Sequence, residues 1–254
     1  MTSKAETILE VNDLKVHFPI RRGVLALTVG YVKAVDGVSF ALKRGETLGI
    51  VGESGSGKST LVRALTGLEK PTGGAFRLSA RAGMVFQDPL GALNPRQTVR
   101  DLLAEAVVHS NRAAGRENAA QAESPLSLLQ AVGLDESALD RYPHEFSGGQ
   151  RQRICIARSL AAKPELLVLD EAVSALDLSI RAAILDLLSA LKARYHLSYL
   201  FITHDLGVVS HFAERLIVMQ KGRIVEAGPT REILHNPKTP YVKTLIGSSL
   251  SIPG

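Results

Sequence analysis

Nine consecutive residues have the composition and order of a phosphate-binding loop: Gly52, Glu53, Ser54, Gly55, Ser56, Gly57, Lys58, Ser59 and Thr60. The apolar run 47–51 before them predicts a strand, and residues 58–68 predict a helix. The glycines allow backbone N–H groups to point inward at an anion, and the start of a helix adds partial positive charge. Lys58 would reach the β- and γ-phosphates of a nucleotide, and the Ser59 hydroxyl would ligate Mg²⁺. A chance glycine-rich turn is the alternative, so this interpretation depends on the motifs that follow.

A second phosphate-binding element is predicted at Ser147, Gly148, Gly149 and Gln150. Ser147 is a favourable N-cap for a helix predicted over 148–162. Backbone amides at a helix start, together with a serine hydroxyl, form a surface that binds phosphate. A loop with only a capping role would use the same residues, and the two interpretations are compatible.

Two carboxylates, Asp170 and Glu171, follow the apolar run 166–169, which itself follows Pro164. Four consecutive apolar residues predict a fully buried strand of a parallel sheet. The carboxylates then lie just past the end of the strand, where open α/β sheets bind their ligands. Asp170 would hold Mg²⁺ or its water shell, and Glu171 could polarise an attacking water. An isolated Asp-Glu pair is more often structural, but its position after the other two motifs favours catalysis.

The chain resembles the nucleotide-binding subunit of an ABC transporter, because these motifs and three others stand in the order found in that family. The others are a glutamine loop at 84–89 containing Gln87, a D-loop at 174–177, and a switch histidine, His204, after the apolar run at 201–202. The resemblance covers roughly residues 8–228. It implies an α/β fold: a P-loop NTPase (RecA-like) core with a mostly parallel sheet, a small antiparallel arm and an inserted α-helical subdomain.

The resemblance also implies the chemistry, which is ATP hydrolysis with Mg²⁺. Gln87 would sense the γ-phosphate, help hold the metal and couple to the membrane subunit. His204 would contact the γ-phosphate and help to position Glu171 and the water, and Asp177 would lie at the nucleotide. In this family the signature of one subunit faces the P-loop of the other, so one chain supplies two half-sites. ATP binding would close the pair of subunits, and hydrolysis would reopen it.

A finer resemblance is to the importer branch that handles oligopeptides, dipeptides and nickel or related metal chelates. It is carried by the strings at 88–96, 142–146, 226–229 and 235–241. It implies two membrane-spanning permease subunits, a second ATPase subunit (a paralogue or a second copy) and an extracytoplasmic solute-binding protein. The chain would then lie peripherally on the cytoplasmic face of the cell membrane. These strings do not identify the cargo.

Three departures from the family pattern have consequences. Ala172 stands where a proline commonly follows the catalytic glutamate. The segment 73–84 is short, which predicts a trimmed antiparallel arm. The sequence ends soon after Tyr241, without the Cys-containing extension of many peptide importers, and its single cysteine is Cys155. A C-terminal iron–sulfur site is therefore not expected.

Length and composition fit one large α/β domain with a smaller helical insertion, since the chain has 254 residues of which 45% are apolar. The predicted organisation is a catalytic core with the antiparallel arm (1–94 and 164–228), a helical subdomain with the signature (95–163) and a tail (229–254). No apolar run approaches the roughly 18 residues that span a bilayer, and residues 1–10 lack the apolar core of a signal peptide. One cysteine excludes an intrachain disulfide, and Cys155, within an apolar stretch, is predicted to be a small buried hydrophobe.

The net charge of +5 and the pI near 9.4 could indicate nucleic acid or an anionic membrane as a partner. The basic residues are dispersed, and aromatic residues are only 5%, which argues against nucleic acid and favours contact with anionic lipid beside a membrane partner. Alternatives are an exporter subunit, a soluble ABC ATPase of DNA repair or translation, and a non-ABC P-loop kinase. The single cassette, the missing heptads and the S-G-G-Q element argue against the last two.

The elements that position these residues can also be predicted. Runs at 8–11 and 38–42 predict strands, with an insertion-like loop at 18–23 and an insertion at 19–33 between them. An aromatic in this region, Phe18 or Tyr31, should stack on adenine. Residues 99–108 and 125–132 predict helices, joined by a variable connection at 111–124. Strand–helix alternation over 164–228 predicts a parallel sheet.

Overall fold

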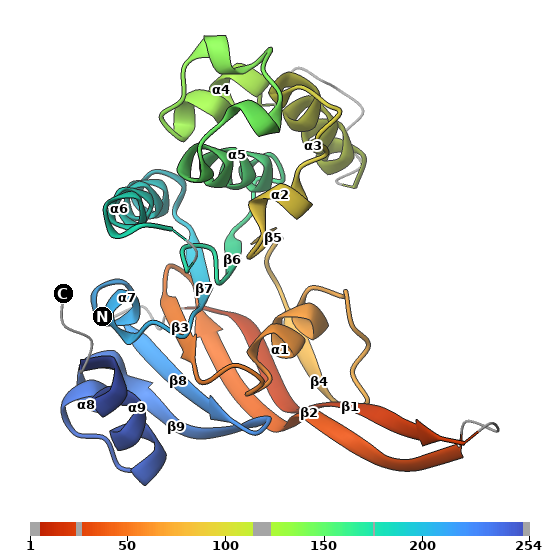
Figure 1. Ribbon diagram of the computed structural model, residues 1–254, viewed down its shortest axis with the longest axis vertical. Helices are drawn as coiled ribbons and strands as arrows, with labels where there is room; N and C mark the ends of the chain where they lie inside the picture. The colour runs from red at the N-terminus through yellow and green to blue at the C-terminus, as the bar shows by residue number, and fades with distance from the viewer. Residues whose placement is uncertain (1–5, 24–26, 114–122, 175, 251–254) are drawn as a thin grey trace. The chain divides into compact units, whose positions relative to one another are not determined.

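Internal contacts divide the chain into two units, Met1–Ser79 with Tyr199–Gly254, and Ala80–Ser198. A computed structural model describes residues 6–23, 27–113, 123–174 and 176–250. Both units contain strands and helices (Figure 1). The mostly parallel α/β architecture with a small antiparallel sheet confirms the predicted fold class.

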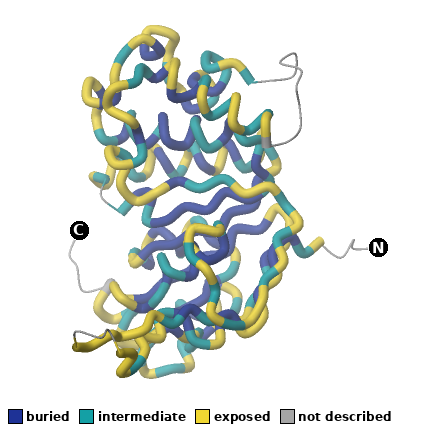
Figure 2. Tube along the Cα trace, turned by 90° about the vertical axis from the view of Figure 1, so that its right-hand side faces the viewer, coloured by how far each residue is buried: buried dark blue, intermediate teal, exposed yellow. Residues whose placement is uncertain are grey.

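Parallel strands form the centre of the first unit. Strand β3 (Thr47–Val51) pairs in parallel with β7 (Ser198–Ile202) on one side and with β8 (Arg215–Gln220) on the other. Strand β9 (Arg223–Pro229) pairs antiparallel with β8. Every residue of β3 and β7 is buried (Figure 2), as expected for apolar runs that are covered on both faces.

An antiparallel sheet in the same unit has the strand order β2-β1-β4. Its strands are β1 (Thr7–Arg22), β2 (Leu27–Lys43) and β4 (Gly73–Leu78). Helix α1 (Lys58–Leu65) packs against β1 and β2 (Figure 1), and it ends three residues earlier than the sequence predicted. Leu14 and Val16 of β1 are buried because they alternate onto one face.

The prediction of an insertion-like loop at 18–23 was wrong. Strand β1 continues to Arg22, and strand β2 begins at Leu27. The end of β1 and the start of β2 therefore form a two-stranded ribbon from most of the predicted insertion. Phe18 pairs with Val32, and Arg22 pairs with Leu27. Pro19 is tolerated because β4 pairs only with β1 residues 9–15, so β1 has one neighbour at this point. The strand length depends on pairing with distant residues, which local turn signals do not report.

C-terminal helices pack against the parallel strands of the first unit. These are α7 (Leu206–Phe212), α8 (Thr230–His235) and α9 (Pro240–Leu250). A buried apolar cluster joins them to the sheet through residues such as Val51, Val209, Ile233 and Val242. The C-terminal helices are therefore packed onto the strand that leads into the phosphate-binding loop.

The second unit has one parallel pair, β5 (Ala82–Val85) with β6 (Leu166–Asp170), and all five β6 residues are buried as predicted. Its helices are α2 (Pro89–Ala92), α3 (Val99–Ala113), α4 (Pro125–Ala131), α5 (Gly148–Leu160) and α6 (Leu178–Tyr195). Two 3₁₀ turns, Glu136–Ala138 and Pro143–Glu145, lie between α4 and α5. The predicted helices at 99–108 and 125–132 are confirmed, whereas residues 114–122 of the predicted connection lie outside the described residues.

Candidate nucleotide-binding site

The phosphate-binding loop folds around its own lysine. It connects β3 to α1, and Lys58 is only 4% exposed. The ammonium Nζ donates to the carbonyl oxygens of Gly52 (2.6 Å) and Glu53 (2.9 Å) and lies 3.4 Å from Ser56 Oγ. A buried cation needs such partners, and here they hold it beside the loop amides. Glu53, Ser54 and Gly55 at the top of the loop are exposed, so an anion can approach them.

The turn between β8 and β9 supports this loop through backbone hydrogen bonds. Gly222 donates its N–H to Ser56 O (2.9 Å) and accepts the Asp36 N–H at its carbonyl oxygen (2.8 Å). The turn therefore ties the phosphate-binding loop to strand β2. Sequence reasoning missed this contact, because residues 221–223 carry only an ordinary turn signal.

An ionic cluster centred on Asp36 holds the same junction. The Asp36 side chain is 10% exposed. Its carboxylate accepts from Arg223 Nη2 (2.6 Å) and Nε (3.1 Å), and His17 Nε2 lies 3.0 Å away. The Lys33 ammonium is 3.8 Å from the carboxylate. The hydrogen bonds from Arg223 hold the pKa of Asp36 below its usual value, and His17 and Lys33 lower it further, although desolvation opposes them.

Replacing Asp36 with Asn should therefore remove a pH-dependent part of the stability. The folded pKa is below the unfolded value of about 3.9, so the contribution is complete above that value and lost as the pH falls through the folded pKa. We expect urea unfolding to give a constant difference in free energy of unfolding between wild type and Asp36→Asn from pH 7 to about pH 5. The difference should shrink towards pH 3. A pH-independent difference would contradict this role.

The predicted switch histidine belongs to the same unit as the phosphate-binding loop. His204 is exposed and follows β7, whose Ile202 is the parallel partner of Ile50 in β3. Thr203 donates its N–H to Ile50 O (3.2 Å). Asp205 then caps α7 by accepting the N–H groups of Gly207 (2.9 Å) and Val208 (3.3 Å). The loop and the histidine thus leave the same edge of the sheet from adjacent strands.

Helix α9 also reaches the phosphate-binding loop. Glu53 donates its N–H to the Tyr241 hydroxyl oxygen (3.2 Å). The start of α9 is fixed by Glu226, whose carboxylate accepts the N–H groups of Lys238 (3.0 Å) and Thr239 (3.1 Å). Sequence reasoning missed this role for Tyr241, since nothing in the string 235–241 indicates its target.

Removing the Tyr241 hydroxyl should loosen the loop without touching the nucleotide. One neutral hydrogen bond contributes about 0.5–1.5 kcal/mol, so we expect Tyr241→Phe to raise the KM for ATP about two- to tenfold. The kcat should be unchanged. Steady-state ATPase kinetics measure both values, with Tyr195→Phe as the matched hydroxyl deletion in the other unit. An unchanged KM would mean that the hydroxyl does not support the loop.

In the second unit, the glutamine loop meets one of the two carboxylates predicted to act in catalysis. Strands β5 and β6 pair in parallel with Val85 opposite Leu169, so their ends lie together. Gln87 Nε2 donates to Glu171 Oε2 at 3.3 Å. Glu171 has a φ of 48°, a conformation that non-glycine residues seldom adopt and that clusters at functional sites. Asp170, at the end of β6, is 6% exposed.

The signature forms a complete capping box at the start of α5. Ser147 Oγ accepts the Gln150 N–H (3.3 Å), and Gln150 Oε1 accepts the Ser147 N–H (3.0 Å). The predicted N-cap is therefore confirmed, and Ser147 itself is exposed. A Cβ at Gly149 would lie 2.5 Å from Ile180 Cγ2, so α6 can approach only a glycine here. Asp177 occupies the N-cap position of α6, and Ala175 of the D-loop lies outside the described residues.

The C-terminal half of helix α5 is bonded to the glutamine loop and to α2. Ser159 Oγ donates to Met84 O (2.7 Å), Arg158 donates to Ala92 O, and Cys155 Sγ lies 3.8 Å from Pro89 O. Cys155 is 5% exposed, and burial raises the pKa of its thiol to about 12, which confirms it as a small buried residue. The signature helix and the glutamine loop therefore form one bonded assembly within this unit.

The two aromatic candidates for the adenine contact lie on opposite faces of the β1–β2 ribbon. Phe18 lies on the same face of β1 as Leu14 and Val16, because side chains alternate along a strand. That face is buried towards α1. Tyr31 pairs with Pro19 on the other face. Only Phe18 therefore lies on the side of the helix that follows the phosphate-binding loop.

The predicted metal donors are all oxygens: the Ser59 hydroxyl, the Gln87 amide oxygen and the Asp170 carboxylate. This donor set suits Mg²⁺, which is usually held by one or two carboxylates together with substrate phosphates and water. Among the described residues, no group of three or more His, Cys, Asp and Glu side chains could hold a metal ion by itself.

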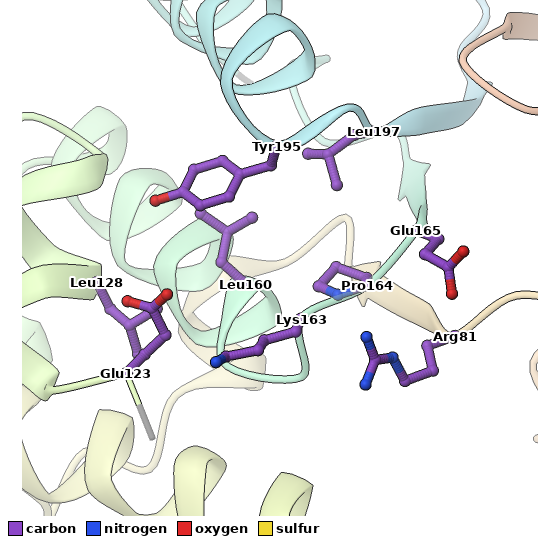
Figure 3. Close-up of a pocket in the computed structure, with 9 residues that line it drawn as sticks. All are labelled: Arg81, Glu123, Leu128, Leu160, Lys163, Pro164, Glu165, Tyr195 and Leu197. Carbon is purple, nitrogen blue, oxygen red and sulfur yellow. The ribbon is translucent and has the colours of Figure 1, made fainter. Parts of the chain in front are cut away.

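A separate cavity of about 260 Å³ lies within the second unit (Figure 3). Leu160 and Tyr195 face it from one side, and Arg81 and Glu165 from another. None of the predicted site residues lines it. Within the described parts of the chain, no helix is both long and apolar enough to cross a membrane.

Comparison with known proteins identifies the family. The family model described as "ABC transporter" matches residues 35–174. The oligopeptide transport ATP-binding protein AppF of Bacillus subtilis is 49% identical over 96% of this chain and 78% of its own length. The dipeptide transport ATP-binding protein DppF of Escherichia coli is 45% identical over 96% and 77%.

A solved structure extends the comparison to the fold. It is the dimeric, post-hydrolysis ATP-binding cassette MJ0796 with ADP and phosphate, which is 26% identical with a TM-score of 0.71 and covers 88% of this chain and 99% of that one. A family model matched over more than half of the length, together with relatives at 45–49% identity, decides the assignment. The chain belongs to the ABC transporter family, as one of its ATP-binding and ATP-hydrolysing subunits.

Proposed function

We propose that this chain powers a peptide importer by binding and hydrolysing ATP. The class of cargo is inferred from two relatives named for oligopeptide and dipeptide transport. The chain is 49% and 45% identical to them over 96% of its length. The geometry supports the energy-coupling role, because the phosphate-binding loop is built around a buried lysine and a strained glutamate follows a buried strand. The cargo itself would be chosen by other subunits.

The first half-site would hold the nucleotide. The amides of the loop and the Lys58 ammonium would bind the phosphates, and Phe18 would stack on adenine from the α1 side of the ribbon. Mg²⁺, held by Ser59, Gln87 and Asp170, would neutralise charge that develops on the phosphates. His204, one strand away from the loop, would contact the γ-phosphate.

The second half-site would complete catalysis across the pair of subunits. Glu171 would orient and polarise the water, and Gln87 already donates a hydrogen bond to its carboxylate. Ser147, Gly148 and Gly149 would bind the γ-phosphate of ATP on the opposing P-loop, with Gln150 and Asp177 beside it. Because α5 is bonded to the glutamine loop, the signature and Gln87 would move together. ATP would thus favour a closed pair, and ADP would release it.

The remaining partners would be two membrane-spanning permeases, a second ATPase subunit (a paralogue or a second copy) and an extracytoplasmic solute-binding protein. This subunit would sit on the cytoplasmic face of the cell membrane. The glutamine loop is the expected site of contact with the permeases, since it links the catalytic carboxylate to an exposed segment. Leu90 in that segment is 53% exposed, which fits a protein-contact surface.

Affinity purification of the tagged full chain from gently solubilised host membranes tests this proposal. We expect two multi-span subunits and a second ATPase subunit to co-purify. After reconstitution in vesicles with the binding protein, a dipeptide should stimulate ATP hydrolysis and accumulate inside, whereas free amino acids should not. A nickel chelate provides the comparison cargo. Recovery of the chain alone, or with ribosomes or DNA, would refute the transport role.

A further inference from the structure

The outer part of the β1–β2 ribbon, residues 17–23 and 27–33, carries an exposed apolar strip. We call this part the outer ribbon. Phe18, Ile20, Val32 and Leu27 are 36%, 43%, 53% and 64% exposed. Figure 1 shows the ribbon extending past β4, which pairs with β1 only at residues 9–15. A two-stranded ribbon with a bare apolar face gains little stability alone, so a covering surface is expected.

The strip lies on the phosphate-binding side of the first unit. Phe18 is opposite Val32 and Ile20 is opposite Gly30, and opposed residues share a face. A Cβ at Gly30 would lie 3.8 Å from Ile20 Cδ1, which places Ile20 over that position. The same alternation leads back to the buried Leu14 and Val16, against which α1 packs. The strip therefore continues the face that carries the P-loop helix.

Charge complementarity indicates what covers it. From residue 14 to residue 35 the chain has no Asp or Glu, and at the outer end Arg21 and Arg22 are exposed without a carboxylate partner among the described residues. The segment 133–146, which leads into the signature, has the opposite character. Its exposed carboxylates are Asp135, Glu136, Asp140 and Glu145, of which Asp140 is paired with Arg100 and Glu145 with Arg141, and Tyr142 is 40% exposed.

We propose that the outer ribbon docks on segment 133–146 of a second copy of this chain when ATP closes the pair. The inference rests on the proposed function, in which the P-loop of one subunit faces the signature of the other. A ribbon that continues the P-loop face must then approach the residues just before Ser147. Arg22, which shares the face of Ile20, meets the acidic segment, and the strip around Ile20 meets Tyr142. The contact makes closure depend on the ribbon as well as on the nucleotide.

Sedimentation of the full chain in a Glu171→Gln background, with ATP, tests the contact. We expect an ATP-dependent dimer whose dissociation constant rises about tenfold in R21E/R22E, because like charges then face each other. E136R/D140R should weaken the dimer similarly, and the chain carrying all four reversals should regain most of the affinity. Ile20→Asn should weaken the dimer by loss of apolar contact. Added salt should weaken the parent dimer more than the R21E/R22E dimer.

The matched control is R231E/K243E, which reverses two exposed cations on α8 and α9 and should leave the dimer unchanged. Binding of a fluorescent ATP analogue, measured on every variant, separates the possible failures. A parent chain that binds no nucleotide would refute the proposed function. A parent chain that binds ATP but stays monomeric, or a dimer insensitive to R21E/R22E, would overturn only the ribbon contact. Failure of the four-reversal chain to recover would overturn the pairing with segment 133–146.

Discussion

Replacing Glu171 with Gln should lower ATP turnover by about 10²–10⁴-fold, the usual contribution of a positioned general base. The side chain follows a buried strand, its backbone is held at a φ of 48°, and Gln87 orients its carboxylate. Gln keeps the shape and a hydrogen-bonding oxygen but cannot accept the proton of the attacking water. Equilibrium binding should show ATP affinity retained, because the phosphates are held by the loop in the other unit.

Phosphate release under single-turnover conditions measures the chemical step directly. Glu105→Gln is the matched control, since that carboxylate is exposed on α3 and should leave turnover unchanged. If Glu171→Gln hydrolysed ATP at the wild-type rate, the base would have to be assigned to another residue. If it lost ATP binding as well, Glu171 would have a structural role.

Replacing Gly57 with Ala should abolish nucleotide binding, with a loss of affinity of at least about 100-fold, the scale expected for a displacement of about 1 Å. Gly57 has a φ of 105°, and a Cβ there would lie 2.1 Å from the carbonyl oxygen of Ala34. Backbone atoms of β2 cannot yield as a flexible side chain would. The loop must therefore move away from β2, which displaces Lys58 and the amides that follow it.

Gly55→Ala provides the control for this prediction. Gly55 also has a positive φ of 79°, but a Cβ there would meet nothing within 4 Å. It should incur only the backbone strain, about 1–2 kcal/mol, with a smaller loss of affinity. Isothermal titration with ATP, together with thermal unfolding, compares the two variants. Equal losses for both would show that backbone strain, and not the approach to β2, decides the requirement for glycine.

Local sequence predicted those parts of the site in which chemistry depends on neighbours in the chain. The loop at 52–60 can be recognised because glycines, lysine and serine at fixed spacing have few other uses after an apolar strand. The runs before Gly52 and before Asp170 read as buried strands, since every residue in each must avoid water. The cap at Ser147 was likewise readable, because capping is a contact over three residues.

Contacts between distant residues could not be read in this way. Residues 18–23 resemble a loop because they contain Pro19 and Gly23, yet pairing with residues 27–32 makes most of them strand. The supports of the P-loop come from Gly222 and Tyr241, about 165 to 190 positions away in the sequence. Such partners are chosen by how the strands pack, and one sequence carries no record of that choice.

The sequence by itself therefore determined the reaction class and the family, and it predicted which residues perform the reaction. The order of motifs and the types of side chain suffice for these, since the chemistry of phosphate, metal and water restricts which groups can serve. The tertiary structure decided which of Phe18 and Tyr31 lies on the α1 side of the ribbon, what supports the P-loop, and where the apolar ribbon is exposed. These depend on strand pairing and register, in which a single bulge changes which residues face each other, so they follow from the assembled sheet and not from local pattern.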